Sequence, residues 1–341
     1  MKQFQVSLVR WYDEKKRNLP WRKTNDPYLI WLSEVILQQT RVDQGLAYYL
    51  NFQRSFPTIK NLAEASEMEV LNLWKGLGYY SRARNLHKTA KIVVENYQGN
   101  FPSTYDEILK LIGVGPYTAA AISSFAFNEP KAVLDGNVFR VLSRLFGIAT
   151  PIDSNQGKKE YQALAEELLD KENPAKYNQA IMEFGAMQCV PANPKCDICP
   201  LDFMCEAKAK NSVKKLPVKM GKTKIANKYF VFQIIQKDGK VLLEKRTDSG
   251  IWKSLYQFPL IEFNDSTEKI SFLEEGNFNL ISSEMKHVLS HQHLYCHFVT
   301  LSVQDKLINN NQVWVSISDI SDFPIPRVIE KYIEENYELI F

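Results

Sequence analysis

Two acidic residues occupy positions where a carboxyl group could take part in chemistry. Glu34 lies within the apolar run at residues 30–37, which gives it few polar neighbours along the chain. It either faces solvent, as most helical glutamates do, or is held in an apolar site that would raise its pKa. Asp135 comes shortly before a run with helical spacing at 138–145. It can cap that helix, or it can lie beside a nucleotide held by the segment that precedes it.

That preceding segment, residues 111–118, reads Leu-Ile-Gly-Val-Gly-Pro-Tyr-Thr. Gly113 and Gly115 permit a tight turn with outward-facing amides, because glycine accepts positive φ and close approach of a partner. Pro116 suits the first turn of a helix, whose free N-terminal amides and dipole can bind one phosphate. Short motifs of this kind also occur in ordinary turns between helices. With Val114 between the glycines, the pattern is typical of a helix-hairpin-helix that holds a DNA backbone.

Four of the five cysteines are crowded into one loop. Cys189, Cys196, Cys199 and Cys205 are separated by six, two and five residues. Four thiolates on a short loop suit a tetrahedral metal ion or an iron–sulfur cubane, and indicate a reducing compartment more than a disulfide framework. A single Cys-x-x-Cys fits a zinc knuckle, although zinc sites usually pair two such knuckles. Cys296 stands alone and is expected in a strand.

The length of 341 residues predicts two domains, and the net charge of +3 hides an uneven distribution. Eight lysines and no acidic residue occur between Ala207 and Lys237: Lys208, Lys210, Lys214, Lys215, Lys219, Lys222, Lys224 and Lys228. Such a run is either a solvated linker or a contact for a polyanion. The first eight residues are polar and no apolar run approaches a membrane span, so we expect a cytoplasmic protein with no membrane segment.

Helical spacing of apolar residues predicts a helical first part of the chain. The expected helices cover residues 4–18, 28–49, 58–72, 116–127, 138–147, 157–170 and 174–187. Residues 208–227 look like an extended linker. Beyond it, β-branched and aromatic residues predict strands, with a hairpin turn at Asp238-Gly239. The expected strands are 229–236, 240–246, 256–262, 286–289, 294–303 and 312–317, followed by a helix at 326–336.

Residues 31–40 read Trp-Leu-Ser-Glu-Val-Ile-Leu-Gln-Gln-Thr and resemble the catalytic-acid helix of MutY-type adenine DNA glycosylases of the endonuclease III superfamily. Residues 73–85, with paired tyrosines beside arginines, resemble a second, hairpin-like element of that family, and the cysteine spacing is similar to its 4Fe-4S loop. The last third resembles its Nudix-like domain, including Leu-Ser-His-Gln-His-Leu at 289–294.

The resemblance covers nearly the whole chain and implies its domain organisation. It implies a mainly α helix-hairpin-helix glycosylase domain at 1–207 with a 4Fe-4S cluster loop at 189–205, a basic linker at 208–227, and an α+β Nudix-like lesion-recognition domain at 228–341. The cluster would be held by Cys189, Cys196, Cys199 and Cys205.

The resemblance also implies the reaction, which is hydrolytic removal of adenine paired with 8-oxoguanine or guanine in double-stranded DNA. Glu34 would be the general acid and Asp135 the anion that stabilises an oxocarbenium-like sugar. Tyr117 and Asn137 would assist at the sugar, with Arg22 and Gln179 near the adenine. The implied DNA contacts are Gln38, Gln39, Thr40, Tyr79, Gly113, Val114 and Gly115, with Ser290 and His291 reading the oxidised guanine. Without the resemblance, Tyr79 could equally be a packing residue, and residues 289–292 an ordinary β-turn.

Several positions depart from the family pattern. Phe139 replaces a lysine found in some members, and Leu289 replaces the usual phenylalanine. Tyr117 stands where bifunctional relatives carry a Schiff-base lysine, which favours a monofunctional enzyme over an endonuclease III-like lyase. We also expect a monomer. Residues 274–276 are only a fragment of a Nudix metal box, which disfavours a nucleotide pyrophosphatase. A non-catalytic damage-binding protein would have no need for both Glu34 and Asp135.

Overall fold

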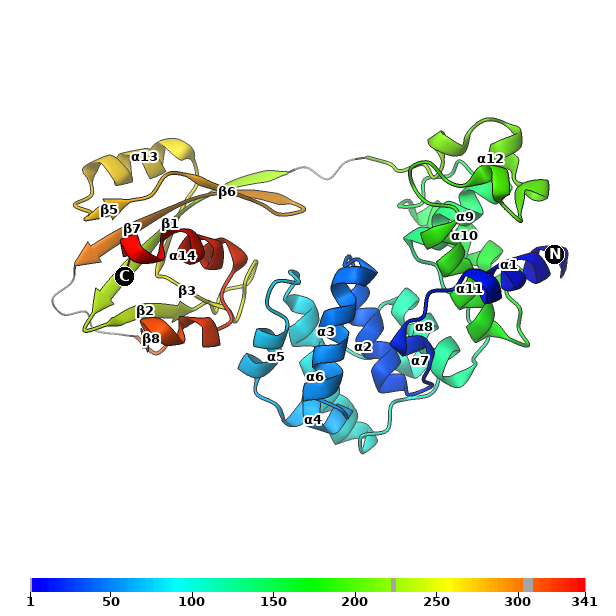
Figure 1. The fold of residues 1–341 in the computed structure, drawn as a ribbon, viewed down its shortest axis with the longest axis horizontal. Coiled ribbons are helices and arrows are strands. Elements are labelled where there is room, and N and C mark those ends of the chain that lie inside the picture. The colour runs from blue at the N-terminus through cyan, green and yellow to red at the C-terminus, as the bar shows by residue number, and fades with distance from the viewer. Residues whose placement is uncertain (1, 222–224, 303–308, 341) are drawn as a thin grey trace. The chain divides into compact units, whose positions relative to one another are not determined.

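The structure is a computed structural model, and it describes residues 2–221, 225–302 and 309–340 (Figure 1). Contacts between Cα atoms divide the chain into two compact units. The first unit consists of Met1–Glu64 and Asn85–Gly221. The second consists of Ala65–Arg84 and Lys222–Phe341, so a segment of the helical half of the sequence groups with the carboxyl-terminal part.

The described part of the first unit is helical (Figure 1). Its α-helices are α1 (Lys2–Lys15), α2 (Pro27–Leu37), α3 (Val42–Ser55), α4 (Ile59–Glu64), most of α6 (Ser81–Tyr97), α7 (Tyr105–Ile108), α8 (Pro116–Phe127), α9 (Gly136–Phe146), α10 (Asn155–Leu168), α11 (Pro174–Met187) and α12 (Glu206–Ala209). Short 3-10 turns lie at Pro20–Arg22, Cys196–Ile198, Asp202–Met204 and Val213–Lys215.

Two of the long helices expected from spacing are broken. The run at 28–49 is interrupted because Gln38 leaves the helical region and Gln39 takes a φ of 55°, so that α3 starts only at Val42. The run at 58–72 is split at Ser66, whose side chain accepts from the amide of Glu69 while Glu69 returns the bond to Ser66. A capping box therefore starts α5, whereas α3 starts at Val42 without a side-chain cap from Arg41.

Helix α11 lies at the centre of the first unit and packs against α1, α8 and α9. The apolar face of α9, formed by Val138, Val141, Leu142 and Leu145, is buried in the same core. Trp11 of α1 meets Phe184 of α11 edge to face, with ring centroids 5.0 Å apart. This packing fixes the N-terminus of α9 and one face of α11 next to each other.

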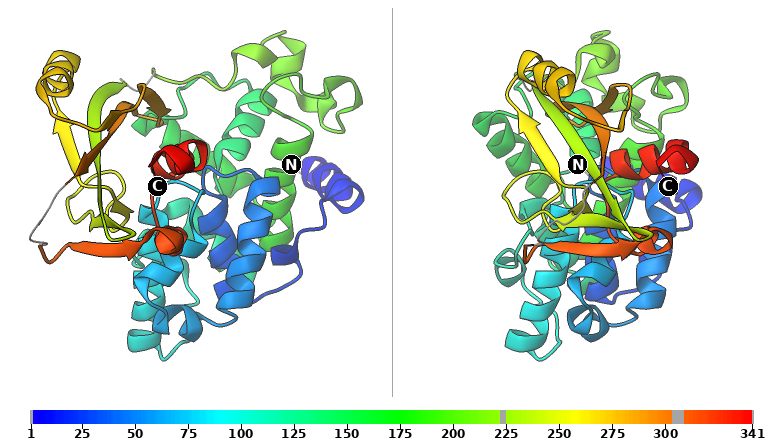
Figure 2. Two further views of the ribbon diagram at one scale, coloured as in Figure 1. Left: turned by 60° about the vertical axis from the view of Figure 1, so that its left-hand side comes forward. Right: turned by 90° about the vertical axis from the view of Figure 1, so that its left-hand side faces the viewer.

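The second unit contains a mixed sheet (Figure 2). Its strands are β1 (Ala226–Lys237), β2 (Lys240–Lys245), β3 (Tyr256–Gln257), β4 (Leu260–Phe263), β5 (Leu280–Ile281), β6 (Met285–Val288), β7 (Gln292–Ser302) and β8 (Gln312–Ser316). The order is β3-β2-β1-β7-β5, with β4 on β1, β6 on β7 and β8 on β2. Only the β1–β7 pairing is parallel among these described pairs, and it places Phe232 opposite Phe298.

Helices cover both faces of the sheet. Tyr229 and Phe232 are three residues apart on β1 and therefore face opposite sides. Lys269 of α13 (Ser266–Glu275) lies over the Tyr229 ring, and Tyr332 of α14 (Arg327–Ile340) stacks on Phe298 on the Phe232 side, with ring centroids 3.8 Å apart. Helix α5 (Glu67–Leu73) and a 3-10 segment, Ile317–Asp322, complete the described elements of this unit.

Most strands were predicted, with two local differences. Asp238 and Gly239 have φ of 49° and 69°, as the hairpin turn between β1 and β2 requires. The strand expected at 256–262 is divided at Pro259, which has no N–H for a ladder, and its halves pair with β2 and β1. Helix α13 and strand β5 were not expected. Cys296 lies buried in β7, as predicted.

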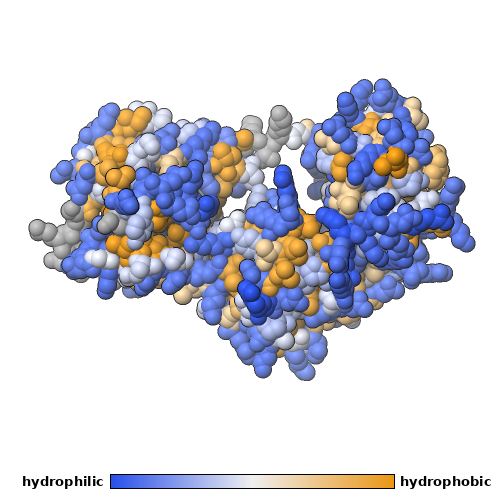
Figure 3. Space-filling model, in the orientation of Figure 1, coloured by the Kyte–Doolittle hydropathy of each residue, from blue (hydrophilic) through white to orange (hydrophobic). Residues whose placement is uncertain are grey.

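The face of the molecule drawn in Figure 3 is mainly hydrophilic, with smaller hydrophobic areas between. Among the described residues, no helix combines the length and the apolar character that crossing a bilayer requires.

Candidate active site

A cavity of about 620 Å³ opens in the first unit. It contains all six side chains for which catalytic or adenine-binding roles were expected: Arg22, Glu34, Tyr117, Asp135, Asn137 and Gln179. These residues come from the turn before α2, from α2 itself, from the start of α8, from the start of α9 and from α11. Tertiary packing therefore gathers side chains that are up to 157 positions apart, Arg22 and Gln179 being the extremes.

Glu34 is buried in the cavity wall, with only 7% of its surface exposed. The hydroxyl of Tyr117 donates to Glu34 Oε2 at 2.5 Å. Burial raises the pKa of Glu34 to about 7, and the nearby Asp135 acts in the same direction, while the Tyr117 hydrogen bond and the charge of Arg22 oppose the rise. A carboxyl group with this pKa can carry a proton at neutral pH and release it.

Asp135 lines the cavity and is also the helix cap considered from the sequence, whereas its place beside a nucleotide stays a prediction. It is the N-cap of α9, and its Oδ1 accepts from the amides of Asn137 and Val138 at 2.8 and 2.7 Å. The side-chain amide of Asn137 donates to Asp135 Oδ2 at 2.7 Å. Burial raises the pKa of Asp135, whereas these hydrogen bonds and the charge of Arg140 favour its ionised form. The two carboxyl groups thus have different environments, since three donors stabilise negative charge on Asp135 and one reaches Glu34.

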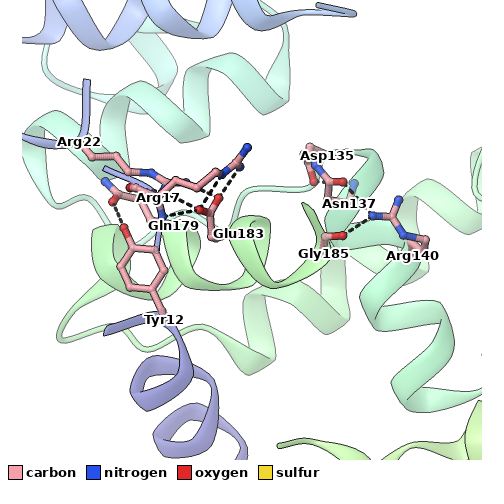
Figure 4. A network of polar contacts seen from close by, with 9 residues as sticks. All are labelled: Tyr12, Arg17, Arg22, Asp135, Asn137, Arg140, Gln179, Glu183 and Gly185. Carbon is pink, nitrogen blue, oxygen red and sulfur yellow. Dashed lines mark hydrogen bonds and ion pairs between the residues drawn. The ribbon is translucent and has the colours of Figure 1, made fainter. Parts of the chain in front are cut away.

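Arg140 holds Asn137 in turn. Its Nη2 donates to Asn137 Oδ1 at 2.9 Å and to the carbonyl of Gly185 at 2.6 Å (Figure 4). Its Nε donates to the carbonyl of Cys189 at 2.7 Å. The orientation of the Asn137 amide is therefore fixed from both ends.

A buried ionic network lines the opposite side of the cavity (Figure 4). Glu183 of α11 is bound by the guanidinium groups of Arg17 and Arg22, and Tyr12 donates to Gln179 Oε1 at 2.7 Å. Burial opposes ionisation of Glu183, but the hydrogen bonds from both arginines outweigh it and lower its pKa to about 2. Sequence reasoning missed Glu183 and Arg17. The spacing of Glu183 one helical turn after Gln179 was the available signal.

The segment before α8 forms the tight glycine turn that was predicted, and its binding of a phosphate stays a prediction. Gly113 has a φ of 77°, and a Cβ there would come within 2.8 Å of the Asn85 side chain, so glycine is required. Among the described residues, no group accepts a hydrogen bond from the amides of Gly113 or Gly115. The amide of Val114 already donates to the carbonyl of Leu111 at 3.2 Å, so it is not free for a ligand.

Gln38, Gln39 and Thr40 form the turn between α2 and α3. The side-chain amide of Gln38 donates to Thr118 Oγ1 at 3.3 Å, and Thr40 Oγ1 donates to the carbonyl of Gln38 at 3.4 Å. Thr40 also lines the cavity of about 620 Å³. The three residues expected to contact DNA thus stand directly beyond the helix that carries Glu34.

The second unit contains the remaining expected DNA-contacting residues. Tyr79, with a φ of 49° and 43% of its surface exposed, donates from its hydroxyl to Ser290 Oγ at 2.7 Å. Ser290 and His291 lie in the turn between β6 and β7, and their side chains are 3.3 Å apart. All three residues line a second cavity of about 560 Å³, together with Trp252 and Arg84. The ring of Tyr79, the hydroxyl of Ser290 and the imidazole of His291 therefore line one cavity of the second unit.

The four clustered cysteines are half-buried in one loop packed against the core of the first unit. Their charges influence one another: besides burial, the proximity of Cys189, Cys205 and Cys196 raises the pKa of Cys199, to about 11. Arg144 donates from Nη1 to Cys189 Sγ at 3.4 Å and to the carbonyl of Val190 at 2.8 Å. Within the described ranges, no three His, Cys, Asp or Glu side chains are arranged as ligands of a metal ion.

Family models match both parts of the chain. Residues 32–171 match the HhH-GPD superfamily base excision DNA repair protein, and residues 230–335 match the NUDIX domain. These matches confirm the predicted fold class, a helix-hairpin-helix glycosylase domain followed by a Nudix-like domain.

Named relatives are similar over nearly the full length. The adenine DNA glycosylase of Buchnera aphidicola subsp. Baizongia pistaciae is 37% identical over 343 residues, covering 97% of this chain and 95% of that protein. The adenine DNA glycosylase of Homo sapiens is 44% identical over 214 residues, covering 60% of this chain and 39% of that protein.

Solved structures resemble the helical part. A thermostable thymine-DNA glycosylase superposes with a TM-score of 0.57 and 31% identity, covering 61% of this chain and 96% of that one. A non-covalent endonuclease III–DNA complex gives a TM-score of 0.53 at 23% identity, covering 62% of this chain and 97% of that one, which shows the shared fold.

Proposed function

Since the chain belongs to the adenine DNA glycosylase family of base excision repair enzymes, which hydrolyse N-glycosyl bonds, we propose that it excises adenine paired with 8-oxoguanine or guanine in duplex DNA. The observation that carries this proposal is the pair of carboxyl groups in one cavity, with Glu34 buried and at a pKa of about 7. Base removal requires a proton donor and an anion in different environments, and Glu34 and Asp135 supply them.

In the proposed reaction, Glu34 donates its proton to N7 of a flipped adenine, while the bond between N9 and C1′ breaks and its electron pair remains on the base. Asp135 stabilises the positive charge that develops on the sugar, and Asn137 holds the aspartate carboxylate through Oδ2. Water then adds to C1′, and the proton that it loses restores Glu34. Tyr117 orients Glu34 throughout by its hydroxyl.

The base itself would be recognised by Arg22 and Gln179. Both side chains line the cavity, and both are fixed by neighbours, Arg22 by Glu183 and Gln179 by Tyr12. Fixed donors and acceptors favour one pattern of base-edge groups over another.

DNA would be held outside the cavity by several elements. We assign the amides of Gly113 and Gly115 and the N-terminus of α8 to a phosphate, with Val114 shaping the turn through its bond to Leu111. The turn of Gln38, Gln39 and Thr40 would contact the duplex. Tyr79 is the proposed wedge between bases, because its ring is partly exposed and its hydroxyl is anchored to Ser290.

Ser290 and His291 are the proposed readers of the oxidised guanine. Both are exposed at a hairpin turn, and a hydroxyl and an imidazole can bond to the groups that distinguish 8-oxoguanine from guanine at ring positions seven and eight. Leu289 precedes them, so no aromatic ring from this position contributes. The residues at the end of α13 supply no complete Nudix metal box, which supports recognition over hydrolysis in this unit.

We further propose that Cys189, Cys196, Cys199 and Cys205 hold a 4Fe-4S cluster. The four thiols lie close enough to affect one another electrostatically, and a cubane is larger than a single ion, so its thiolates stand further apart than those around zinc. With four thiolates bound, the cluster would supply structural fixation of the loop. No open position would remain for substrate.

The proposal is tested by base release. Duplexes with a central adenine opposite 8-oxoguanine, guanine or thymine are incubated with excess protein, and free adenine and abasic strands are measured. We expect rapid release opposite 8-oxoguanine, slower release opposite guanine and none opposite thymine. Absence of adenine release from both mispairs would refute the proposal.

A further inference from the structure

Glu183 is a fully buried carboxylate in the wall of the catalytic cavity, and it takes no direct part in the proton transfer or bond cleavage described so far. Its side chain is 0% exposed and projects from α11 toward the side where Arg22 and Gln179 lie (Figure 4). An ionised carboxylate at this depth is unfavourable unless several donors bind it.

Two arginines supply those donors. Arg17 bonds Glu183 through its main-chain amide and Nε, both at 2.9 Å, and through Nη2 at 2.5 Å. Arg22 bonds it in a bidentate manner, with Nη1 to Oε1 at 2.9 Å and Nη2 to Oε2 at 2.7 Å. Bidentate pairing fixes the plane of a guanidinium group, so the orientation of Arg22 depends on Glu183.

The charge of this network reaches the general acid. Glu34 faces Tyr117 from α8, Asp135 from the start of α9 and Arg22 from the turn before α2, and the positive charge of Arg22 lowers the pKa of Glu34. Arg17 and Arg22 together carry two positive charges, and Glu183 cancels one of them. Removal of the Glu183 charge would leave Arg22, which acts on Glu34, and Arg17, which lines the same cavity, without a compensating negative charge.

We propose that Glu183 is a positioning residue for base excision, which holds Arg22 in place for the adenine and limits the positive charge near Glu34. This inference rests on the proposed adenine excision. Glu183 itself does not touch the reacting atoms, because its carboxylate oxygens are occupied by the two arginines.

The test is the pH dependence of single-turnover excision from the adenine:8-oxoguanine duplex with saturating protein, so that DNA binding does not limit the rate. Excision by the wild-type protein falls as pH rises through the pKa of Glu34, since the unprotonated acid cannot donate. In Glu183→Gln the added net positive charge favours the carboxylate form of Glu34. We expect the pH at which the excision rate falls to be lower in this variant, by on the order of one pH unit.

Arg17→Gln provides the opposite change, because it removes a positive charge and leaves Arg22 paired with Glu183. In Arg17→Gln, the excision rate should therefore fall at a higher pH than in the wild-type protein. Arg17 is partly exposed, with 34% of its side chain accessible, so this variant carries the test even if Glu183→Gln does not fold. Asp13→Asn is the matched control: Asp13 pairs with Lys176 of α11 at 2.8 Å on the surface, and its loss should leave the pH profile in place.

The outcomes separate the two proposals. If the wild-type protein releases no adenine, the proposed function fails. If the wild-type protein is active and thermal melting shows folded variants, an unchanged pH profile in Glu183→Gln and Arg17→Gln, or shifts of the opposite sign, would overturn the role of Glu183. A uniform loss of rate without a shift would indicate a purely structural role.

Discussion

Replacement of Glu34 by glutamine removes the acidic proton of this side chain and preserves its size and shape. The glutamine side chain has the same shape, and its carbonyl oxygen can still accept the Tyr117 hydroxyl that lies 2.5 Å from Glu34 Oε2. An amide cannot donate a proton to adenine as a carboxylic acid does. General acid catalysis contributes about a hundredfold or more, which corresponds to about 3 kcal/mol in the activation free energy. We therefore expect Glu34→Gln to lose excision by that factor while it keeps binding to the mispaired duplex.

The same substitution should stabilise the protein at alkaline pH, because the pKa of Glu34 is about 7 against an ordinary value of 4.5. Below pH 4.5 the folded and unfolded chains both carry the proton, and stability is unaffected. As pH rises toward 7, the unfolded chain releases the proton first, so the free energy of unfolding falls and then levels off. The free energy of unfolding of the wild-type protein decreases by about 3 kcal/mol in total, because Glu34 is deeply buried. Glu34→Gln does not show this decrease.

Both effects are measured on one preparation. Single-turnover excision is followed from pH 6 to 9 for the wild-type protein and for Glu34→Gln, and urea unfolding is compared near pH 5 and near pH 8.5. Glu64→Gln is the control, because Glu64 is exposed on α4 and pairs only loosely with Lys60, at 3.8 Å. Excision by Glu34→Gln within about tenfold of the wild-type rate, or a wild-type rate that does not fall above pH 7, would refute the assignment of Glu34 as the acid.

Three further predictions concern other parts of the chain. Borohydride should trap little covalent complex with abasic DNA, because the side chain at Tyr117 has no amine that could form a Schiff base; efficient trapping would contradict a monofunctional enzyme. Ser290→Ala combined with His291→Ala should narrow the preference for 8-oxoguanine over guanine opposite adenine. Ser283→Ala, at an exposed serine between β5 and β6, should not change this preference. Equal discrimination by the double variant and the wild-type protein would indicate that Tyr79 reads the lesion instead. Purified protein should contain iron and absorb broadly at the blue end of the visible spectrum, and Cys199→Ser should lose this absorption; stoichiometric zinc without iron would disprove the cluster.

Local features of this protein could be derived from its sequence, because they depend on neighbouring residues. Pro116 and the flanking glycines determine the turn before α8, and Asp238-Gly239 determines the hairpin between β1 and β2. Asp135 was recognisable as a possible helix cap for the same reason, since its partners are the next amides along the chain. The identities of the candidate catalytic residues came from the resemblance of short motifs to a known family.

Burial and charge balance were decided only by the tertiary structure. The sequence left Glu34 either exposed or buried, and packing of α2 against α8 enclosed it and gave it a pKa near 7. The spacing of Glu183 after Gln179 indicated only a shared helix face. Its partners Arg17 and Arg22 are more than 160 positions away and meet it only when α11 packs beside the first helix. The bond between Tyr79 and Ser290 likewise joins residues 211 positions apart. Interactions between distant side chains depend on the fold as a whole, since sequence spacing specifies only what a residue can reach within its own helix, strand or turn.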